Sequence, residues 1–210
     1  MGIWSLSPDR TGDAIGVLCA VFPDFPGSEE LAPAERRRVA AILHGRTVQA
    51  GFRWGRIDAW DDPIAGMAVW LARPALVDTT PPQPTSGKRL ADLLGPGIVA
   101  RLEAFDAVMQ RLRAVARPDR HVYLDQLGVL RAHRHQGIAT ALLVAGHAWA
   151  DGMGLPCALD TDTDENVAFY ERRGYRVVAR ERLPDSGRDL VAMRRELRPR
   201  RTAAATTCPG

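Results

Sequence analysis

The spacing of apolar residues along the chain predicts an alternation of helices and strands. In the first half this pattern predicts a strand over residues 3–6, helices over 11–22, 34–45 and 98–116, and strands over 48–60 and 65–72. Asp61-Asp62-Pro63 separates the last two strands and is typical of a hairpin turn. The proline-rich segment 74–87 is predicted to be a flexible surface loop.

Helices and strands alternate more regularly in the second half of the chain. Its apolar pattern predicts strands over residues 121–129, 156–161, 175–179 and 189–194, with helices over 138–152 and 166–173. The shorter helix has Thr163 or Asp164 as its N-cap, and Gly174 follows its end. Such an order is typical of an α/β protein.

Composition and charge narrow the class of protein. Hydrophobic residues make up 46% and charged residues 25% of the 210 residues, the balance of a globular protein with a full core. The net charge of +3 resides in Arg198, Arg200 and Arg201, so the preceding chain is formally neutral. It lacks the basic face that nucleic-acid binding usually requires. No stretch approaches the roughly 18 apolar residues of a membrane span.

The ends of the chain and its cysteines predict one cytoplasmic domain. Acidic residues precede the apolar run 14–22 and argue against a secretory signal. Cys19, Cys157 and Cys208 are scattered, which indicates no disulfide framework and favours a reducing cytosol. We expect a single domain over residues 1–197, followed by a disordered basic tail over 198–210.

One motif carries chemistry. The segment Arg134-His135-Gln136-Gly137-Ile138-Ala139 joins a predicted strand to a predicted helix. Free N–H groups in the first turn of a helix, together with the helix dipole, favour an anion. Gly137 and Ala139 leave room for a diphosphate, and Arg131 and Arg134 add positive charge at the rim. The alternative is a tight turn without a ligand.

The context of this motif resembles a known family. A strand, Arg-x-x-Gly-x-Ala, a helix, a strand and then Asn166-x-x-x-Tyr170-x-x-x-Gly174 resemble the signature half of the GNAT superfamily of N-acyltransferases. Two runs, 66–71 and 166–172, look like the puromycin N-acetyltransferase branch. His135 departs from the pattern, because relatives usually carry glycine there.

The resemblance implies a fold, a co-substrate and a set of binding residues. The fold is a mixed, mostly antiparallel twisted sheet flanked by helices, with splayed central strands, and the co-substrate is acetyl-CoA. The resemblance assigns the cofactor to backbone groups of Leu127, Gly128 and Val129, to the first-turn segment Gln136, Gly137, Ile138, Ala139 and Thr140, and to the side chains of Arg134, Asn166 and Phe169. Transfer to the amine is direct in this family, so Cys157 is interpreted as a buried apolar residue.

Tyr170 is the predicted general acid. It shares a helix face with Asn166, four residues earlier. A tyrosine with a pKa near ~10 is reasonably matched to a leaving thiol whose pKa is near ~8.5. The alternative is that Tyr170 only packs its helix against the sheet.

The general base has two candidates, Asp125 and Asp160. Strand alternation predicts that Tyr123, Asp125 and Leu127 face the same way, toward the substrate. An aspartate with a pKa near ~3.9 is a weak base for an alkylammonium unless burial raises its pKa or a water relays the proton. The choice between the two stays open at this point.

Other constellations give weaker signals. The acidic group Asp160, Asp162, Asp164 and Glu165 either attracts a cationic amine or caps the following helix. His133 and His135 have no third ligand nearby, so no metal site is predicted. Lys88 is the only lysine, and no phosphate loop of the Gly-Lys-Ser/Thr type is present.

The function predicted from the sequence is acetylation of a primary amine on a small molecule. The branch resemblance suggests an antibiotic or an amine metabolite, with resistance or detoxification as the role. Acetylation of a protein or peptide amine and a non-catalytic acyl-CoA sensor are the alternatives. We expect a monomer or homodimer with neither nucleic-acid nor membrane partners.

Overall fold

The computed structural model describes residues 2–73, 84–116, 120–183 and 187–197. Its strands are β1 (Ile3–Ser5), β2 (Gly55–Trp60), β3 (Gly66–Arg73), β4 (His121–Val129), β5 (Cys157–Thr161), β6 (Arg176–Arg182) and β7 (Asp189–Arg195). Its helices are α1 (Thr11–Val21), α2 (Pro33–Trp54), α3 (Pro84–Ala116), α4 (Ile138–Gly152) and α5 (Asp164–Glu171). Short 3-10 helices are η1 (Pro8–Arg10), η2 (Ser28–Glu30) and η3 (Arg131–His133).

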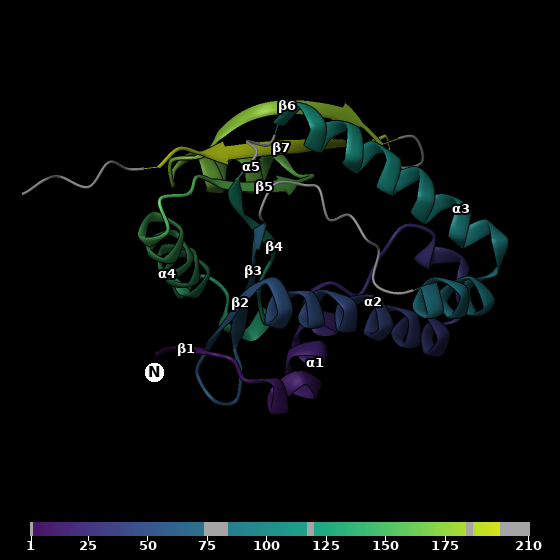
Figure 1. Cartoon of the computed structure of the whole chain (residues 1–210). Coiled ribbons are helices and arrows are strands. Elements are labelled where there is room, and N and C mark those ends of the chain that lie inside the picture. Colours follow the sequence, from purple (N-terminus) through teal and green to yellow (C-terminus); the bar gives the residue numbers. More distant parts are fainter. Residues whose placement is uncertain (1, 74–83, 117–119, 184–186, 198–210) are drawn as a thin grey trace, which may run out of the picture.

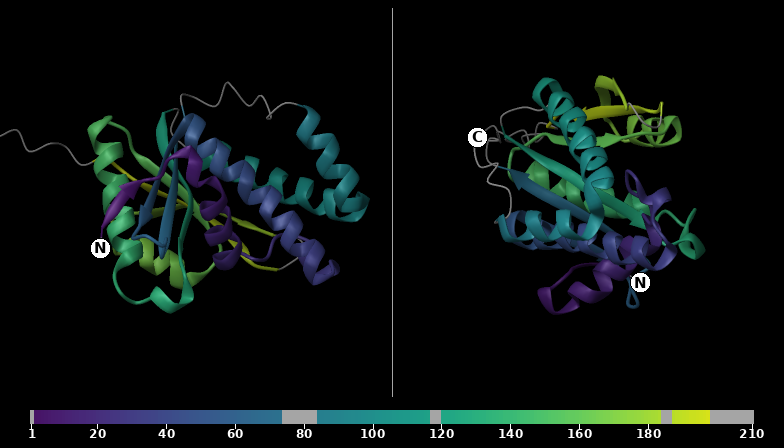
Figure 2. Two further views of the ribbon diagram at one scale, coloured as in Figure 1. Left: turned by 90° about the horizontal axis from the view of Figure 1, so that it is seen from below. Right: turned by 90° about the vertical axis from the view of Figure 1, so that its right-hand side faces the viewer.

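The seven strands form one mixed sheet in the order β1-β2-β3-β4-β5-β7-β6. All neighbouring strands are antiparallel except the central pair β4 and β5, which are parallel. Helices α1 and α2 cover one face, whereas α4 and α5 cover the other (Figures 1 and 2). The predicted architecture of a mostly antiparallel sheet flanked by helices is therefore confirmed.

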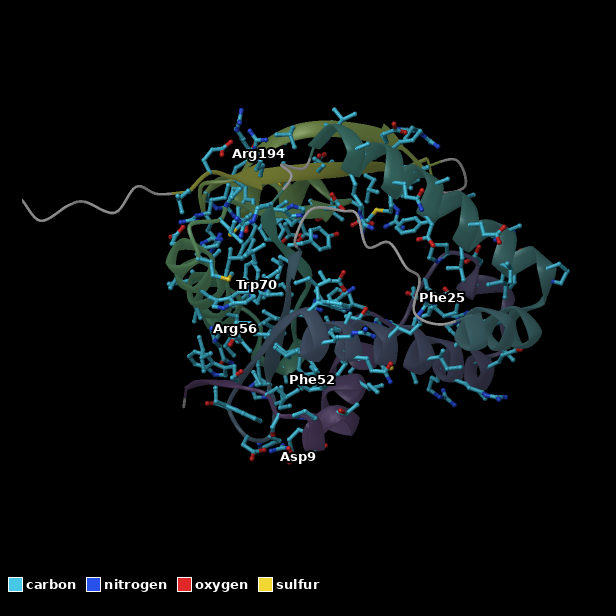
Figure 3. The ribbon with its side chains drawn as sticks, in the orientation of Figure 1. Asp9, Phe25, Phe52, Arg56, Trp70 and Arg194 are labelled. Carbon is cyan, nitrogen blue, oxygen red and sulfur yellow. The ribbon has the colours of Figure 1, made fainter. Side chains whose placement is uncertain are left out.

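Helix α4 packs closely on the sheet at one point. A Cβ atom on Gly146 would lie 2.0 Å from the indole ring of Trp70, which is fully buried on β3 (Figure 3). Only glycine permits this approach of helix to strand. The contact fixes the position of α4 on the sheet, and with it the turn that leads into the helix.

Helix α3 connects two distant parts of the molecule. Ile98, in its first half, packs with Val39 of α2. Its last turns contribute Val108, Met109 and Leu112 to a cluster with β7 and the end of β6. The helix therefore runs from α2 to the β6–β7 pair, as Figure 1 shows. This path brings the last turn of α3 to the same face of the sheet as α1 and α2.

Two sequence predictions differ from the structure. The predicted strand 48–60 is β2 only from Gly55, because α2 continues to Trp54. Val48 and Gly51 of this stretch are buried against the sheet, so tertiary packing overrides the β propensity of the local residues. The predicted loop 74–87 is helical from Pro84, since proline is compatible with the first turn of a helix. Residues 74–83 and 198–210 lie outside the described residues.

Among the described residues, no helix is both long and apolar enough to cross a membrane.

Candidate active site

The turn before α4 presents unpaired backbone donors. Gly137 is the N-cap, with a φ of 81° and no side-chain cap, and the first helical hydrogen bond runs from Ala141 N to Gly137 O over 3.0 Å. The N–H groups of Ile138, Ala139 and Thr140 therefore have no intrahelical partner. A Cβ atom at Gly137 would meet no atom within 4 Å, so open space lies beside these donors. The arrangement fits the diphosphate of coenzyme A.

His135 has a left-handed backbone conformation, with a φ of 63°. A non-glycine residue in this region costs about 1 kcal/mol, although histidine tolerates it better than most residues. This conformation explains why glycine is the usual residue at the equivalent position of the family that the motif resembles. The side chain is exposed.

Arg134 reaches back toward the strand that precedes the turn. Its Nε donates a hydrogen bond to the carbonyl oxygen of Val129 over 3.3 Å. This contact ties the guanidinium to the end of β4 while the side chain remains exposed at the rim. Arg134 therefore lies beside the unpaired N–H groups, where its charge favours an anion.

Strands β4 and β5 separate after a short paired stretch. Their parallel register covers only Val122–Leu124 and Cys157–Leu159. Asp125 then forms a bulge, because Leu124 pairs with Trp70 whereas Gln126 pairs with the preceding residue, Val69. The following segment of β4, which contains Leu127, Gly128 and Val129, pairs with β3 alone. Splayed central strands are therefore present, with the edge of β4 open toward β5.

The bulge corrects the predicted alternation along β4. Tyr123 packs in the cluster beneath α1 and α2, whereas Leu127 packs against the cluster beneath α4. The expectation that Tyr123, Asp125 and Leu127 face the same way is therefore wrong for Leu127. One extra residue in a strand reverses the faces of every residue after it.

Asp160 belongs to a polar cluster on the face of the sheet that α1 and α2 cover. Tyr123 donates its hydroxyl hydrogen to Asp160 Oδ2 over 2.9 Å, and Arg113 Nη2 donates to the Tyr123 hydroxyl over 3.3 Å. Arg113 Nε also lies 3.5 Å from Asp160 Oδ2. The side chain of Asp160 is only 4% exposed. One oxygen of this candidate base is thus already engaged by a hydroxyl and a cation.

Asp125 lies near the same arginine. Burial lowers the pKa of Arg113, but the charges of Tyr123, Asp160 and Asp125 outweigh burial and raise this pKa above its ordinary value. Asp125 itself is half-buried at the bulge. The structure therefore brings both candidate carboxylates to one arginine, where the central strands separate.

Tyr170 approaches from the opposite face. Its ring packs edge to face with Phe169 and Tyr175, at centroid distances of 5.1 Å and 5.6 Å, within the cluster beneath α4. Burial raises the pKa of Tyr170 above its usual range, against an opposing effect of Arg173. Its hydroxyl has no hydrogen-bond partner in the part of the chain that the structure describes. The hydroxyl is therefore protonated and available as a donor, although its raised pKa lies further from that of a leaving thiol than the ordinary tyrosine value near ~10.

The N-terminus of α5 is capped as predicted. Thr163 is the N-cap, and its hydroxyl accepts a hydrogen bond of 3.2 Å from the backbone N–H of Asn166, whose side chain is exposed. Asp164 and Glu165 lie in the exposed first turn, where their negative charges interact favourably with the positive end of the helix dipole. Asp162 instead accepts a hydrogen bond of 2.7 Å from Arg188.

Cys157 is fully buried on β5. Burial raises the pKa of its thiol to about 11, although Arg195 acts in the opposite direction. Such a thiol carries little thiolate near neutral pH. Cys157 thus lies in the buried cluster beneath α4, with Arg195 Nη1 4.0 Å from its sulfur.

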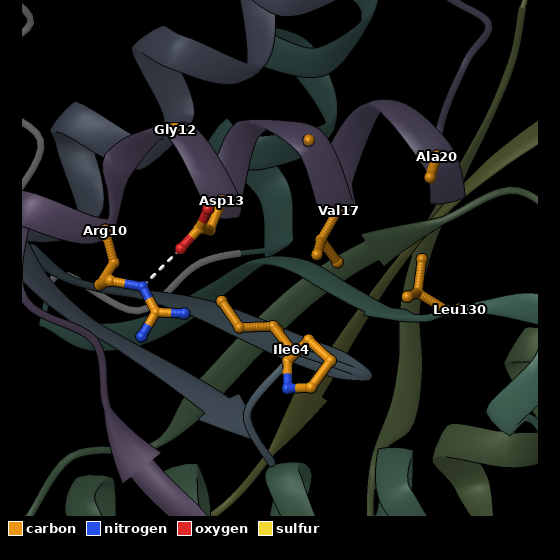
Figure 4. A pocket seen from close by; sticks show the side chains of 9 residues that line it. Arg10, Gly12, Asp13, Val17, Ala20, Ile64 and Leu130 are labelled. Atoms are coloured by element: carbon orange, nitrogen blue, oxygen red, sulfur yellow. Dashed lines mark hydrogen bonds and ion pairs between the residues drawn. The ribbon is translucent and has the colours of Figure 1, made fainter.

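A separate groove lies beside α1 and contains none of the predicted site residues. It is lined by Arg10, Gly12, Asp13, Gly16, Val17, Ala20, Pro63, Ile64 and Leu130 (Figure 4). Arg10 closes one end through ion pairs with Asp13 and Asp62. The groove therefore lies apart from the polar cluster of Arg113, Tyr123 and Asp160.

Sequence reasoning missed two residues of the site. Arg113 was assigned only to a helix with an apolar stripe, and its contacts lie 10 and 47 residues away in sequence. Arg173 lies within the predicted helix 166–173, at an unspecified position of the motif, and carries no recognisable signal in a single sequence. Its contact with Phe169 is local, four residues back in sequence, whereas its contact with Thr140 exists only because α5 packs near α4.

Comparison with known proteins agrees with this architecture. The sequence model of the Acetyltransferase (GNAT) family matches residues 22–175. The fold is similar to that of a histone acetyltransferase HPA2 and related acetyltransferase from Corynebacterium glutamicum, with a TM-score of 0.68, 20% identity, and coverage of 95% of this chain and 98% of that one. Arylalkylamine N-acetyltransferase 2 from Aedes aegypti has a TM-score of 0.64 and 14% identity, covering 94% and 99% of the two chains.

A third similar structure is the ribosomal-protein-S18-alanine N-acetyltransferase from Escherichia coli. Its TM-score is 0.55 at 13% identity, and 96% of this chain and 97% of that chain are covered. At these identities the three structures show a shared fold, whereas the family assignment rests on the match over residues 22–175. The chain belongs to the GNAT family of acetyltransferases, which are acyltransferase enzymes that use acetyl-CoA as co-substrate.

Proposed function

We propose that the protein transfers an acetyl group from acetyl-CoA directly to the primary amine of a small molecule. The observation that carries this proposal is the placement of Tyr170 on one face of the sheet and of Asp125 and Asp160 on the other, where β4 and β5 separate. An acid and a base on opposite sides of one gap suit a reaction in which an amine attacks and a thiol leaves.

The binding part of the proposal uses the chain's own backbone. Acetyl-CoA supplies an activated thioester whose leaving group is a thiol. The N–H groups at the start of α4 bind the diphosphate, and the open edge of β4 at Leu127, Gly128 and Val129 orients the pantetheine arm. Asn166 and Phe169 border the arm from α5. The unpaired donors support the diphosphate assignment, whereas the roles of the β4 backbone, Asn166 and Phe169 follow from the family resemblance.

The chemical part of the proposal names the residue that accepts a proton from the amine and the residue that donates a proton to the thiol. Asp125 accepts the proton of the attacking ammonium, directly or through one water, because it is half-buried at the bulge where the strands separate, whereas the Asp160 side chain is only 4% exposed. Tyr170 holds its proton by virtue of burial and donates it to the departing sulfur. Asp160 then acts as a positioning residue, through the Tyr123 hydroxyl and Arg113.

The position of α3 supports a small molecule as the acceptor. Helix α3 spans from α2 to the β6–β7 pair, and the Arg113 side chain at its end is 25% exposed. A protein substrate needs an open groove on this face, whereas a small amine needs an enclosed pocket. The resemblance to the puromycin N-acetyltransferase branch supports an antibiotic or amine metabolite as acceptor, with resistance or detoxification as the role. The free thiols of Cys19 and Cys157 are compatible with work in the cytosol.

A panel of amines tests the proposal. Purified protein is incubated with acetyl-CoA and either small primary amines, including aminonucleoside and aminoglycoside antibiotics, or peptides with free N-termini. Thiol release and mass spectrometry report transfer. We expect turnover on small amines. Turnover only on peptides would favour a protein acetyltransferase, and acetyl-CoA binding without turnover on any amine would favour a sensor.

A further inference from the structure

The side chain of Arg173 joins the two helices that border the proposed cofactor site. Its Nη1 donates a hydrogen bond of 2.7 Å to the carbonyl oxygen of Phe169 in α5. Its Nη2 donates a hydrogen bond of 2.6 Å to the hydroxyl of Thr140, in the first turn of α4. One guanidinium thus links the helix that carries Tyr170 to the helix that presents the unpaired N–H groups.

The same guanidinium lies over an aromatic ring. Its central carbon is 3.6 Å from the ring centroid of Phe169, which in turn packs edge to face with Tyr170. Stacking of this kind holds an arginine in one orientation. The side chain of Arg173 therefore has little freedom, and its position relative to Tyr170 is set.

The charge of Arg173 lacks a compensating carboxylate. In the described ranges no acidic side chain forms an ion pair with it, and its buried Nε has no hydrogen-bond partner. Burial, followed by repulsion from Arg172, lowers the pKa of Arg173 below its ordinary value, and Tyr170 opposes this only in part. By contrast, Arg195 forms a bidentate pair with Asp151 at 2.9 Å and 2.8 Å. An anion beside α4 would stabilise the cation that the protein leaves uncompensated.

We propose that Arg173 is a positioning residue for the phosphate groups of acetyl-CoA, which holds the first turn of α4 and supplies the positive charge that the bound anion compensates. The inference rests on the use of acetyl-CoA by the family and not on the identity of the acceptor amine. It predicts that phosphate binding at α4 and the placement of Tyr170 depend on one side chain.

Calorimetric titration with coenzyme A tests the charge. We expect Arg173→Gln to weaken binding about tenfold or more at low salt, since a charge-assisted contact is lost. The effect should shrink toward about 1 M salt, where the screening length falls to roughly 3 Å. Arg172→Gln is the matched control, because it removes the same charge from an exposed neighbouring position. This control should change the dissociation constant by no more than about twofold.

Two further variants separate charge from packing. Arg173→Lys keeps the charge but loses the two-pronged contact, and should fall between the wild type and Arg173→Gln. Thr140→Val removes the hydroxyl from the other side of the contact while it preserves the backbone donors, and it serves if Arg173→Gln does not fold. We expect it to weaken coenzyme A binding several-fold.

Three results from the variants would overturn the inference. These are an unchanged dissociation constant for Arg173→Gln, a loss that is equal at low and high salt, and an equal loss for Arg172→Gln. Failure of the wild-type protein to bind coenzyme A would also overturn it. Binding of coenzyme A without acetylation of any amine would instead contradict only the proposed function and leave the inference standing.

Discussion

The hydroxyl of Tyr123 donates a hydrogen bond to Asp160 Oδ2 over 2.9 Å, across the two strands that separate at the predicted cofactor gap. Tyr123 lies one residue before the last paired residue of β4, and Asp160 lies just beyond the paired part of β5. The contact therefore closes the point at which the strands part. Because the contact buries Asp160 while Asp125 stays half-buried at the bulge, we expect Asp125 to be the catalytic base.

Substitution of the two aspartates should separate their roles. Asp125→Asn is expected to lower kcat/KM by about 100-fold and to remove the basic-group limb of the pH–rate profile, since a general base contributes roughly 10²–10⁴-fold. Asp160→Asn should lower the melting temperature but keep this limb, because it mainly disturbs the contacts with Tyr123 and Arg113. Steady-state kinetics over a range of pH provide the measurement. Loss of the limb in Asp160→Asn alone would exchange the two assignments.

Removal of the Tyr170 hydroxyl should slow transfer without weakening binding. Tyr170→Phe is expected to lower kcat by about 100-fold while the KM for acetyl-CoA stays within about twofold. Tyr175→Phe is the matched control: this hydroxyl contacts His147 at 3.1 Å, so its loss should reduce stability by about 1 kcal/mol and leave kcat nearly unchanged. Equal kcat values for Tyr170→Phe and the wild type would exclude the acid role.

The buried thiol of Cys157 should respond to alkaline pH through stability and not through catalysis. Its pKa is raised to about 11 in the folded protein, against an ordinary value near ~8.5. The folded state therefore favours the protonated thiol. This stabilisation is fully present below about pH 8.5 and is lost as pH rises toward 11.

Denaturant titrations of the wild type and Cys157→Ala over this pH range provide the measurement. The variant should lose less stability than the wild type as pH rises, and it should retain acetyl transfer, since direct transfer needs no enzyme thiol. Loss of activity in a folded Cys157→Ala protein would contradict direct transfer.

His135→Gly should relieve the strained backbone of the turn before α4. We expect a gain in the free energy of unfolding of up to about 1 kcal/mol, together with unchanged or tighter acetyl-CoA binding. His133→Gly is the control, since His133 lies in η3 with no positive φ, and glycine there should cost about 0.5–1 kcal/mol. Chemical denaturation compares both variants with the wild type. A destabilised His135→Gly protein would show that the side chain contributes more than the strain costs.

Local signals in the sequence predict the second half of the fold well. The strand that ends at Val129 and the helix over Ile138–Gly152 agree with the structure, because the intervening turn and the apolar face are both encoded within a few residues. The stretch 48–54 was predicted wrongly as strand. There, long-range burial of Val48 and Gly51 decides the conformation, and periodicity does not report it.

The candidate site also has a part that the sequence predicts and a part that it does not. The unpaired donors at the start of α4 follow from a local motif that a single sequence displays. The contacts among Arg113, Tyr123 and Asp160 do not, because three separate elements must meet before they exist. The sequence also did not predict the bulge at Asp125, because strand alternation assumes an unbroken register.

Helix α3 lies in sequence between the neighbouring strands β3 and β4, and Arg113 in its last turn contacts the polar cluster. Under the proposed function, α3 thus contributes to the acceptor side, while the contiguous segment that follows it in sequence forms the donor side. If this division holds, changes in α3 would alter the preference for the amine and leave the binding of the thioester unchanged.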